Sequence, residues 1–227
     1  IASLPLQSRE ALFERGVRAP SPIQATAIPF LWRGRSGIIH SETGSGKTLA
    51  FLLPALARAR EADEADPSSQ SVVLVLAPTR ELAIQIVAEA EPHSHGDVAF
   101  AALASRSSWD RLMDATMIVA TPQELLEIFD KQDAEDVKIL LGRIEVVCLD
   151  EFDELLPKKN YEGKRKSRYM DPGMWPTEGF LKRLIRNNER PTLQVIAASA
   201  TAYRPSRAKL FTVLKRDRLW RFPRALR

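Results

Sequence analysis

The sequence predicts an α/β protein of three layers, in which a parallel β-sheet is covered by helices on both faces. Two observations lead to this fold class. Short apolar runs rich in β-branched residues alternate with segments in which Leu and Ala recur at spacings of three and four. The runs are apolar throughout, as in strands buried on both faces, and parallel sheets with right-handed helical crossovers bury their strands in this way.

The apolar runs are predicted as strands and the periodic segments as helices. The strands are expected at residues 37–40, 72–77, 98–102, 117–120, 146–149 and 194–198. The helices are expected at residues 48–60, 80–91, 122–130 and 180–186. Because ligands of such sheets bind at the carboxyl ends of the strands, the loops at that edge are the expected place of function.

Two stretches interrupt the alternation. Residues 61–71 carry four acidic side chains followed by Pro67 and serines, and we expect a surface loop there. Residues 157–179 form a longer basic insertion, with a turn signal at Asp171-Pro172-Gly173. A nucleic-acid contact and a solvated loop are both open interpretations of its basic side chains. These are Lys158, Lys159, Lys164, Arg165, Lys166 and Arg168.

Composition excludes several other classes of protein. The 227 residues carry 33 Lys and Arg against 29 Asp and Glu, a net charge of +4, and 44% are hydrophobic. This balance is ordinary for a folded domain and unlike a disordered tail, a collagen or a coiled coil. The apolar runs fall short of the ~20 residues of a membrane-spanning helix, so no membrane partner is expected. The chain begins at Ile1, so we expect a fragment.

Cysteine and histidine give no sign of a metal centre. A single cysteine, Cys148, excludes an internal disulfide scaffold, and its place within a predicted strand indicates an inert core residue. His93 and His95 have no supporting cluster of ligands nearby in the sequence. We therefore expect both to be loop residues rather than metal ligands.

A phosphate-binding loop follows the first predicted strand. Residues 41–48 read Ser-Glu-Thr-Gly-Ser-Gly-Lys-Thr and lead directly into a helical segment. Backbone N–H groups of such a loop and the positive end of the following helix cradle phosphates. Lys47 adds a cation for the β and γ phosphates, and the Thr48 hydroxyl suits Mg²⁺. The nucleotide contacts are expected from Thr43, Gly44, Ser45, Gly46, Lys47 and Thr48.

An acidic pair ends the predicted strand at 146–149. Asp150 is expected to hold Mg²⁺ through water, and Glu151 to orient or deprotonate the attacking water. A strand that ends in two carboxylates is often only a solvated cap. Together with the phosphate loop it predicts nucleoside triphosphate hydrolysis with Lys47, Asp150 and Glu151 as catalytic residues.

The motifs and their order resemble the DEAD-box ATP-dependent RNA helicases, specifically their first RecA-like lobe, over nearly all of residues 1–227. Residues 1–36 resemble the region of the adenine-sensing Q motif. The strings that carry the resemblance are Ser21-Pro22-Ile23-Gln24, the loop 41–48, Pro78-Thr79-Arg80-Glu81-Leu82-Ala83, Thr121-Pro122, Asp150-Glu151-Phe152-Asp153 and Ser199-Ala200-Thr201. Each is weak alone, but the set in this order is specific to the family.

The resemblance implies roles for matching positions. Gln24 would bind the Hoogsteen edge of adenine, with Ser21 shaping its loop, so the cofactors would be ATP and Mg²⁺. Three residues would contact the RNA backbone, namely Thr79, Arg80 and Thr121. A third set would couple the nucleotide site to the closure of two lobes, namely Asp153, Ser199 and Thr201. The second RecA-like lobe and its arginine finger are not in the chain, so this lobe alone is expected to be inactive.

Three departures from the family pattern affect these expectations. Phe152 stands where the family has Ala and is expected to crowd the base of the site. Glu124 stands where the family has an Arg that grips RNA, and a carboxylate there would repel phosphate. The Gly-Gly element expected after the third strand is replaced by residues 104–107.

Two functions remain open at this stage. The first is an RNA-dependent ATPase that separates or clamps RNA, with RNA and ribonucleoprotein components as partners. The second is a catalytically weakened scaffold or docking factor in an assembly particle. Glu42 and the Arg-rich composition resemble mitochondrial ribosome-assembly helicases, which implies ribosomal RNA as partner and a mitochondrial location. A cytosolic or nucleolar helicase would read much the same.

Overall fold

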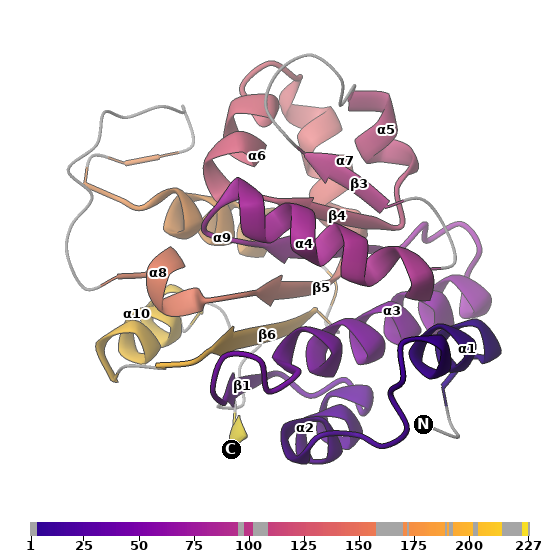
Figure 1. Cartoon of the computed structure of the whole chain (residues 1–227). Coiled ribbons are helices and arrows are strands. Elements are labelled where there is room, and N and C mark those ends of the chain that lie inside the picture. The colour runs from indigo at the N-terminus through magenta and orange to yellow at the C-terminus, as the bar shows by residue number, and fades with distance from the viewer. Residues whose placement is uncertain are drawn as a thin grey trace.

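The computed structural model describes residues 4–94, 98–101, 109–157, 170–171, 173–188, 190, 193–201, 204–214 and 224–226. Within these residues, strands and helices alternate along most of the chain (Figure 1). The strands are β1 Gly37–His40, β2 Val72–Leu76, β3 Val98–Ala101, β4 Met117–Ala120, β5 Ile144–Leu149, β6 Gln194–Ser199 and β7 Arg224–Leu226. The helices are α1 Leu6–Glu14, α2 Pro22–Trp32, α3 Lys47–Ala65, α4 Arg80–Ala90, α5 Trp109–Asp114, α6 Pro122–Phe129, α7 Ala134–Arg143, α8 Phe152–Leu155, α9 Pro176–Asn187 and α10 Arg204–Leu214, with a 3₁₀ turn η1 at Glu91–His93.

The strands form one sheet in the order β3-β4-β2-β5-β6-β1-β7, and every adjacent pair is parallel. The last predicted strand, β6, therefore lies between β1 and β5. Its register pairs His40 with Ser199 and Leu149 with Ala197. The segments that follow β1, β5 and β6 therefore emerge side by side at one edge of the sheet (Figure 1).

Side chains that point alternately to the two faces of the sheet form a hydrophobic core on each face. In β2, Leu74 and Leu76 pack into a cluster with helices α6, α7, α9 and α10, whereas Val73 and Val75 pack with α2, α3 and α4 on the other face. Successive side chains of a strand point to opposite faces, so a run of Val and Leu fills both cores. The predicted three-layer fold class is confirmed.

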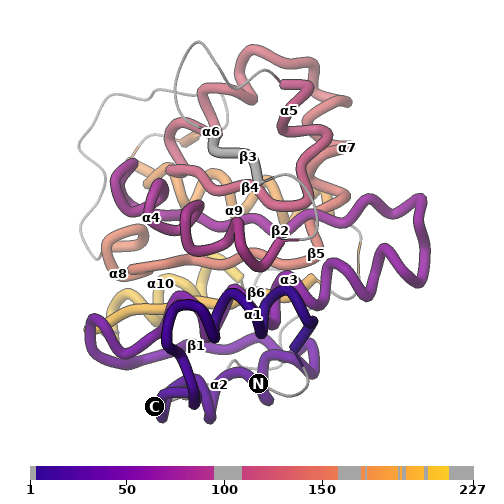
Figure 2. Tube along the Cα trace, turned by 45° about the vertical axis from the view of Figure 1, so that its right-hand side comes forward, coloured from indigo at the N-terminus to yellow at the C-terminus, as the bar shows by residue number. Residues whose placement is uncertain are grey.

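The amino-terminal helix is attached to the second of these faces. Leu12 of α1 packs against Leu49 and Leu53 of α3, and Figure 2 shows α1 lying beside α3. Arg15 adds a salt bridge of 2.8 Å to Glu89 of α4. Ile28 and Trp32 of α2 pack against the same cluster, so the helix that carries Gln24 is also fixed to the helix that follows the phosphate loop.

Two sequence expectations about boundaries were wrong. The expected acidic loop at residues 61–71 begins as helix, because α3 continues to Ala65. Ala and Glu are strong helix formers, and an i,i+4 ion pair between Arg60 and Glu64 supports the extension. The expected insertion at residues 157–179 ends earlier, since Pro176 begins α9. Its basic residues at 158–169 lie outside the described residues, as do His95 and residues 104–107.

Two residues that the sequence singled out lie in the core. Cys148 is fully buried within β5, and burial raises the pKa of its thiol, which agrees with an unreactive core cysteine. His93 is only 1% exposed, in η1 rather than in an open loop. Within the described residues no group of three or more His, Cys, Asp and Glu side chains is placed to hold a metal ion by itself, and no helix is long and apolar enough to cross a membrane.

His93 should make stability fall in mild acid. Neither ring nitrogen has a hydrogen-bond partner among the described residues. Burial lowers the pKa of His93. The nearby Arg15 also lowers this pKa, whereas Glu89 raises it by a part of the shift. The folded state contains the neutral imidazole of His93. The free energy of unfolding therefore has its full value above pH ~6.5 and decreases as the pH falls toward the lower pKa that His93 has in the folded state. We expect His93→Phe to reduce the drop in thermal midpoint between pH 7.5 and pH 5. An equal drop in both proteins would contradict this reading.

Candidate functional site

The loop between β1 and α3 encloses the ammonium group of Lys47. Its Nζ donates to the backbone carbonyls of Ser41 at 2.9 Å and Glu42 at 3.0 Å, and the side chain is 6% exposed. Ser45 closes the loop through its hydroxyl, which donates to the Glu42 carbonyl at 2.6 Å. Thr43 and Gly44 lie exposed at the tip, and Thr48 is half-buried in the first turn of α3. The predicted nucleotide residues therefore share one compact loop at a helix N-terminus, which favours anions.

Gln24 joins this loop to the amino-terminal region. Its amide Nε2 donates to the Gly46 carbonyl at 3.1 Å, and its Oε1 accepts from the backbone N–H of Ser21 at 3.0 Å. Ser21 caps α2 and donates its hydroxyl to the Ser45 carbonyl at 2.7 Å. An amide group has two donors and two acceptor lone pairs, so Gln24 retains capacity for a base edge after these bonds. Its predicted adenine contact stays a prediction.

The hydrogen bond between Gln24 and the backbone of residue 46 requires a glycine at that position. Its backbone φ is +91°, which side chains other than glycine rarely adopt. A Cβ at this position would lie 2.4 Å from Gln24 Nε2 and 3.4 Å from Ser21 Oγ. The glycine thus permits both the turn of the loop and the approach of Gln24.

Two carboxylates follow β5 and face the phosphate loop. Asp150 is 3% exposed, and burial together with the neighbouring Glu151 raises its pKa to about 6 even though Lys47 opposes the shift. Glu151 Oε1 lies 4.0 Å from Lys47 Nζ, and its Oε2 accepts from the Ala200 N–H at 3.3 Å. Glu151 has a positive φ of 45°, a strained conformation for a residue with a side chain. The predicted acidic pair thus contacts both the loop after β1 and the segment after β6.

The three residues predicted to couple the nucleotide site to lobe closure, Asp153, Ser199 and Thr201, are also joined by hydrogen bonds. The hydroxyl of Thr201 donates to Asp153 Oδ2, while Ser199 Oγ accepts from the Thr201 N–H at 3.0 Å. The contact joins the turn after β5 to the turn after β6. Whether it couples two lobes stays a prediction.

Phe152 does not crowd the nucleotide site as the sequence led us to expect. The ring is completely buried in the core cluster that contains Leu155 and Phe180, on the face opposite α3. The larger residue therefore fills core volume and leaves the carboxylates of Asp150 and Glu151 in place.

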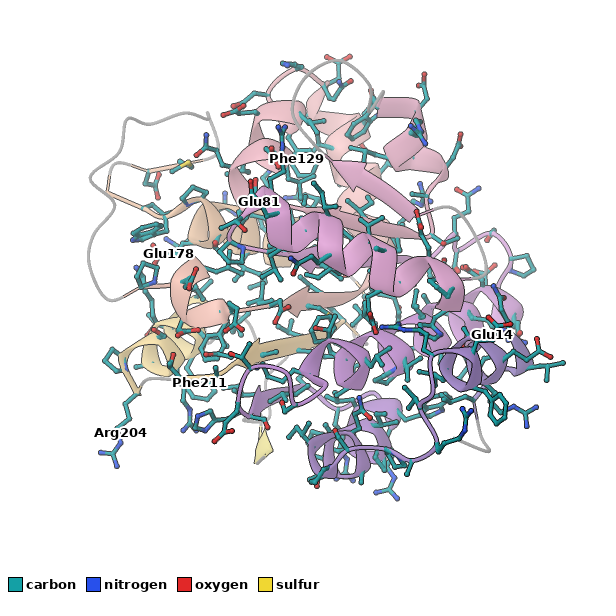
Figure 3. All side chains as sticks on the ribbon, viewed as in Figure 1. Glu14, Glu81, Phe129, Glu178, Arg204 and Phe211 are labelled. Carbon is teal, nitrogen blue, oxygen red and sulfur yellow. The ribbon has the colours of Figure 1, made fainter. Side chains whose placement is uncertain are left out.

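A groove lies beside this site, where helices α4, α6 and α9 begin. Its cavity measures about 330 Å³ and is lined by Pro78, Thr79, Arg80, Thr121, Pro122, Gln123, Glu124, Glu154, Leu155, Trp175, Pro176 and Thr177. Figure 3 labels Glu81 and Glu178, which lie in the first turns of α4 and α9, on the side of the molecule that carries α8. The structure therefore brings together all three predicted RNA residues.

Glu124 is not the isolated carboxylate that the sequence suggested. Its Oε1 accepts from Arg80 Nη2 at 3.0 Å and from Arg80 Nε at 3.1 Å, and its Oε2 accepts from the Thr121 hydroxyl at 2.8 Å. Its side chain is 7% exposed and that of Arg80 is 43% exposed. Simple repulsion of phosphate is therefore wrong as a description, because the carboxylate is neutralised by Arg80.

Trp175 and Thr177 line the groove, and the sequence did not lead us to expect them there. Trp175 is half-buried at the N-cap of α9, where its backbone N–H donates to Glu178 Oε2 at 3.0 Å. The Trp-Pro-Thr-Glu string before an apolar periodic segment was the available signal, because Pro and Glu are typical of a first helical turn. Only the folded chain shows that this turn faces Arg80.

The residues present fit a magnesium-bound nucleoside triphosphate. Lys47 places a cation within the loop that precedes the N-terminus of α3, where backbone N–H groups favour phosphate. The raised pKa of Asp150 reflects two carboxylates held close together with little solvent, a charge excess that a divalent cation would relieve. Thr48 and Asp150 supply the oxygen ligands that Mg²⁺ prefers.

Known proteins share the sequence pattern. Residues 21–208 match the family described as DEAD/DEAH box helicase. The chain is 32% identical over 204 residues to the pre-mRNA-processing ATP-dependent RNA helicase PRP5 of Mycosarcoma maydis, which covers 87% of this chain and 16% of that protein. It is 38% identical over 145 residues to the ATP-dependent RNA helicase DBP3 of Coccidioides immitis, which covers 62% of this chain and 27% of that protein. The chain thus matches a minor part of each relative.

Solved structures share the fold. The S. cerevisiae Dbp5 variant bound to RNA and ADP BeF3 is similar with a TM-score of 0.70 and 22% identity. The match covers 98% of this chain and 50% of that chain. At this level of identity the likeness establishes the architecture and leaves the roles of single residues open.

Gly46→Ala should weaken nucleotide binding strongly because its Cβ would displace the Gln24 amide. Gly44→Ala is the matched control, since Gly44 also has a positive φ of 77° but no atom lies within 4 Å of its added Cβ. We expect Gly44→Ala to weaken ATP binding less, by about tenfold or under. In a Gln24→Ala background, Gly46→Ala should cost less than it does alone, as measured by calorimetric titration. Equal costs in the two backgrounds would exclude the proposed clash.

Asp150→Asn should stabilise the nucleotide-free chain at neutral pH. Asp150 has a pKa raised to about 6, so its stabilising protonated form dominates in acid and is lost as the pH rises through about 6. The amide resembles the protonated acid, and the gain at pH 7.5 should reach up to about 3 kcal/mol and vanish below pH ~4. Chemical denaturation measures it, with Glu154→Gln, an exposed carboxylate of α8, as control. A gain independent of pH would contradict the assignment.

Proposed function

Since the chain belongs to the DEAD/DEAH box helicase family, we propose that it is the ATP-binding lobe of an ATP-dependent RNA helicase. One observation carries the proposal. The loop after β1, the acidic turn after β5 and the turn after β6 meet at one sheet edge through the contacts of Glu151 with Lys47 and Ala200. The groove of Arg80 and Thr121 lies beside that edge.

Each residue at this edge has a defined task in the proposal. Lys47 and the loop N–H groups would bind the β and γ phosphates, and Thr48 and Asp150 would hold Mg²⁺, which supplies charge neutralisation for phosphoryl transfer. Glu151 would accept the proton of the attacking water, since its carboxylate is held toward the loop by Ala200. Thr79, Arg80 and Thr121 would hold the RNA backbone at two helix N-termini.

A second candidate function has one observation in its favour. The ion pair of Arg80 with Glu124 leaves the groove with less positive charge than RNA binding uses. This favours a docking or scaffold factor that keeps the fold of the family but binds RNA weakly. Retention of Lys47, Asp150 and Glu151 in mutual contact supports the enzyme over the scaffold.

The cellular setting is also a proposal. We propose ribonucleoprotein assembly, with ribosomal RNA and a mitochondrial location as the specific form. Glu42 in the phosphate loop and the Arg-rich composition support that form. The name of PRP5 assigns that relative to pre-mRNA processing, which supports an RNA-protein particle as the setting in a broader sense.

RNA-stimulated release of phosphate by the full-length protein tests the proposed function. We expect RNA to accelerate hydrolysis, and Glu151→Gln to lower the stimulated rate by about 100-fold or more while ATP still binds, because the amide cannot accept the proton. Glu127→Gln, on α6 and outside the lining of the groove, is the control that should keep the rate. ATP binding without any stimulation by RNA would favour the scaffold instead.

A further inference from the structure

We propose that Glu124 sets the RNA affinity of the groove by neutralising Arg80, so that this lobe binds RNA more weakly than its architecture allows. The inference rests on the proposed function and names the residue that tunes its RNA contact. The observation behind it is a three-residue network. One buried carboxylate bonds Arg80 on α4 with one oxygen and Thr121 on α6 with the other.

The geometry makes Glu124 a fixed partner of Arg80. Both Nε and Nη2 of the guanidinium donate to the same carboxylate oxygen, at 3.1 and 3.0 Å. The carboxylate is nearly excluded from water, and the Thr121 hydroxyl occupies its second oxygen at 2.8 Å. At the buried carboxylate, this charge-assisted bond is shielded less by solvent and salt than a bond between two exposed side chains.

Burial decides which of the two charges an RNA phosphate meets. Arg80 is 43% exposed and lines the groove, so its outer edge remains accessible to a phosphate. Glu124 lies behind it and acts on the same phosphate through its field. The pair has no net charge, so Arg80 releases fewer counterions from RNA than a free arginine would.

Thr121 is held by the same residue. Its hydroxyl donates to Glu124 Oε2 and accepts from the Glu124 N–H, and it caps α6. Glu124 is therefore a positioning residue as well, which orients two predicted RNA contacts toward one groove. The two effects separate experimentally, because orientation alters affinity at every salt concentration, whereas charge alters the dependence on salt.

The test is the salt dependence of RNA binding by the full-length protein. The probe is a single-stranded homopolymer RNA with a non-hydrolysable ATP analogue, titrated between about 50 and 200 mM KCl. Glu124→Gln keeps the size of the side chain and an acceptor for Thr121. We expect about three- to tenfold tighter binding at the lowest salt, and a slope of log affinity against log salt steeper by up to about 0.7.

Three further variants test whether the change in slope comes from the charge of the pair of Arg80 and Glu124. Arg80→Gln should weaken binding and flatten the slope, since it leaves the carboxylate of Glu124 unpaired. The double variant of Arg80→Gln and Glu124→Gln should return close to the slope of the unmutated protein, because the pair it removes has no net charge. Glu127→Gln is the matched control, since Glu127 is one turn along α6, bonds Gln123 at 3.0 Å and does not line the groove.

The outcomes separate this inference from the proposed function. Equal slopes for the unmutated protein and Glu124→Gln, with RNA-stimulated hydrolysis intact, overturn the role of Glu124 alone. Weaker binding by Glu124→Gln with an unchanged slope and thermal midpoint makes Glu124 only an orienting residue and also overturns it. A protein that binds ATP but no RNA at any salt overturns the proposed function and the inference together.

Discussion

The position of β6 between β1 and β5 is the constraint on which the site depends. Parallel pairing on both sides sets Ser199 beside His40 and Ala197 beside Leu149. The three segments that leave these strands are far apart in the sequence, and this strand order brings them together at one edge of the sheet. Gln194 at the start of β6 is fully buried and donates to the carbonyls of Leu31 and Arg35, which anchors the strand against the turn before β1.

Because β6 pairs with both β1 and β5, the residues of the site hold one another in position. Lys47 is held by loop carbonyls, Glu151 approaches it from β5, and the Ala200 N–H fixes Glu151 from β6. Gln24 adds a fourth element through its bond to Gly46. The strained backbone of Glu151 is tolerated because these contacts hold it in place. Such preorganisation suits a reaction that relies on positioning and charge.

The groove beside the site illustrates why a departure from a family pattern needs its tertiary context. In the sequence, Glu124 reads as a negative charge placed against phosphate. In the fold, it is paired with Arg80, so the relevant quantity is the net charge of the pair and not that of one residue. Phe152 is a second example, because this bulky residue next to Asp150 and Glu151 is accommodated by the core behind them.

The sequence by itself determined the fold class, the positions of strands β1 to β6 and of helices α3, α4, α6 and α9, and the glycine-rich pattern of the loop at residues 41–48. These features depend on local pattern: β1 and β4 have the predicted bounds, and α4 and α6 begin where predicted. Only the tertiary structure decided the strand order, the pairing of Arg80 with Glu124 and the place of Trp175 in the groove. Each of these joins residues from separate elements, and the free energy of such contacts depends on packing and burial that no local window contains.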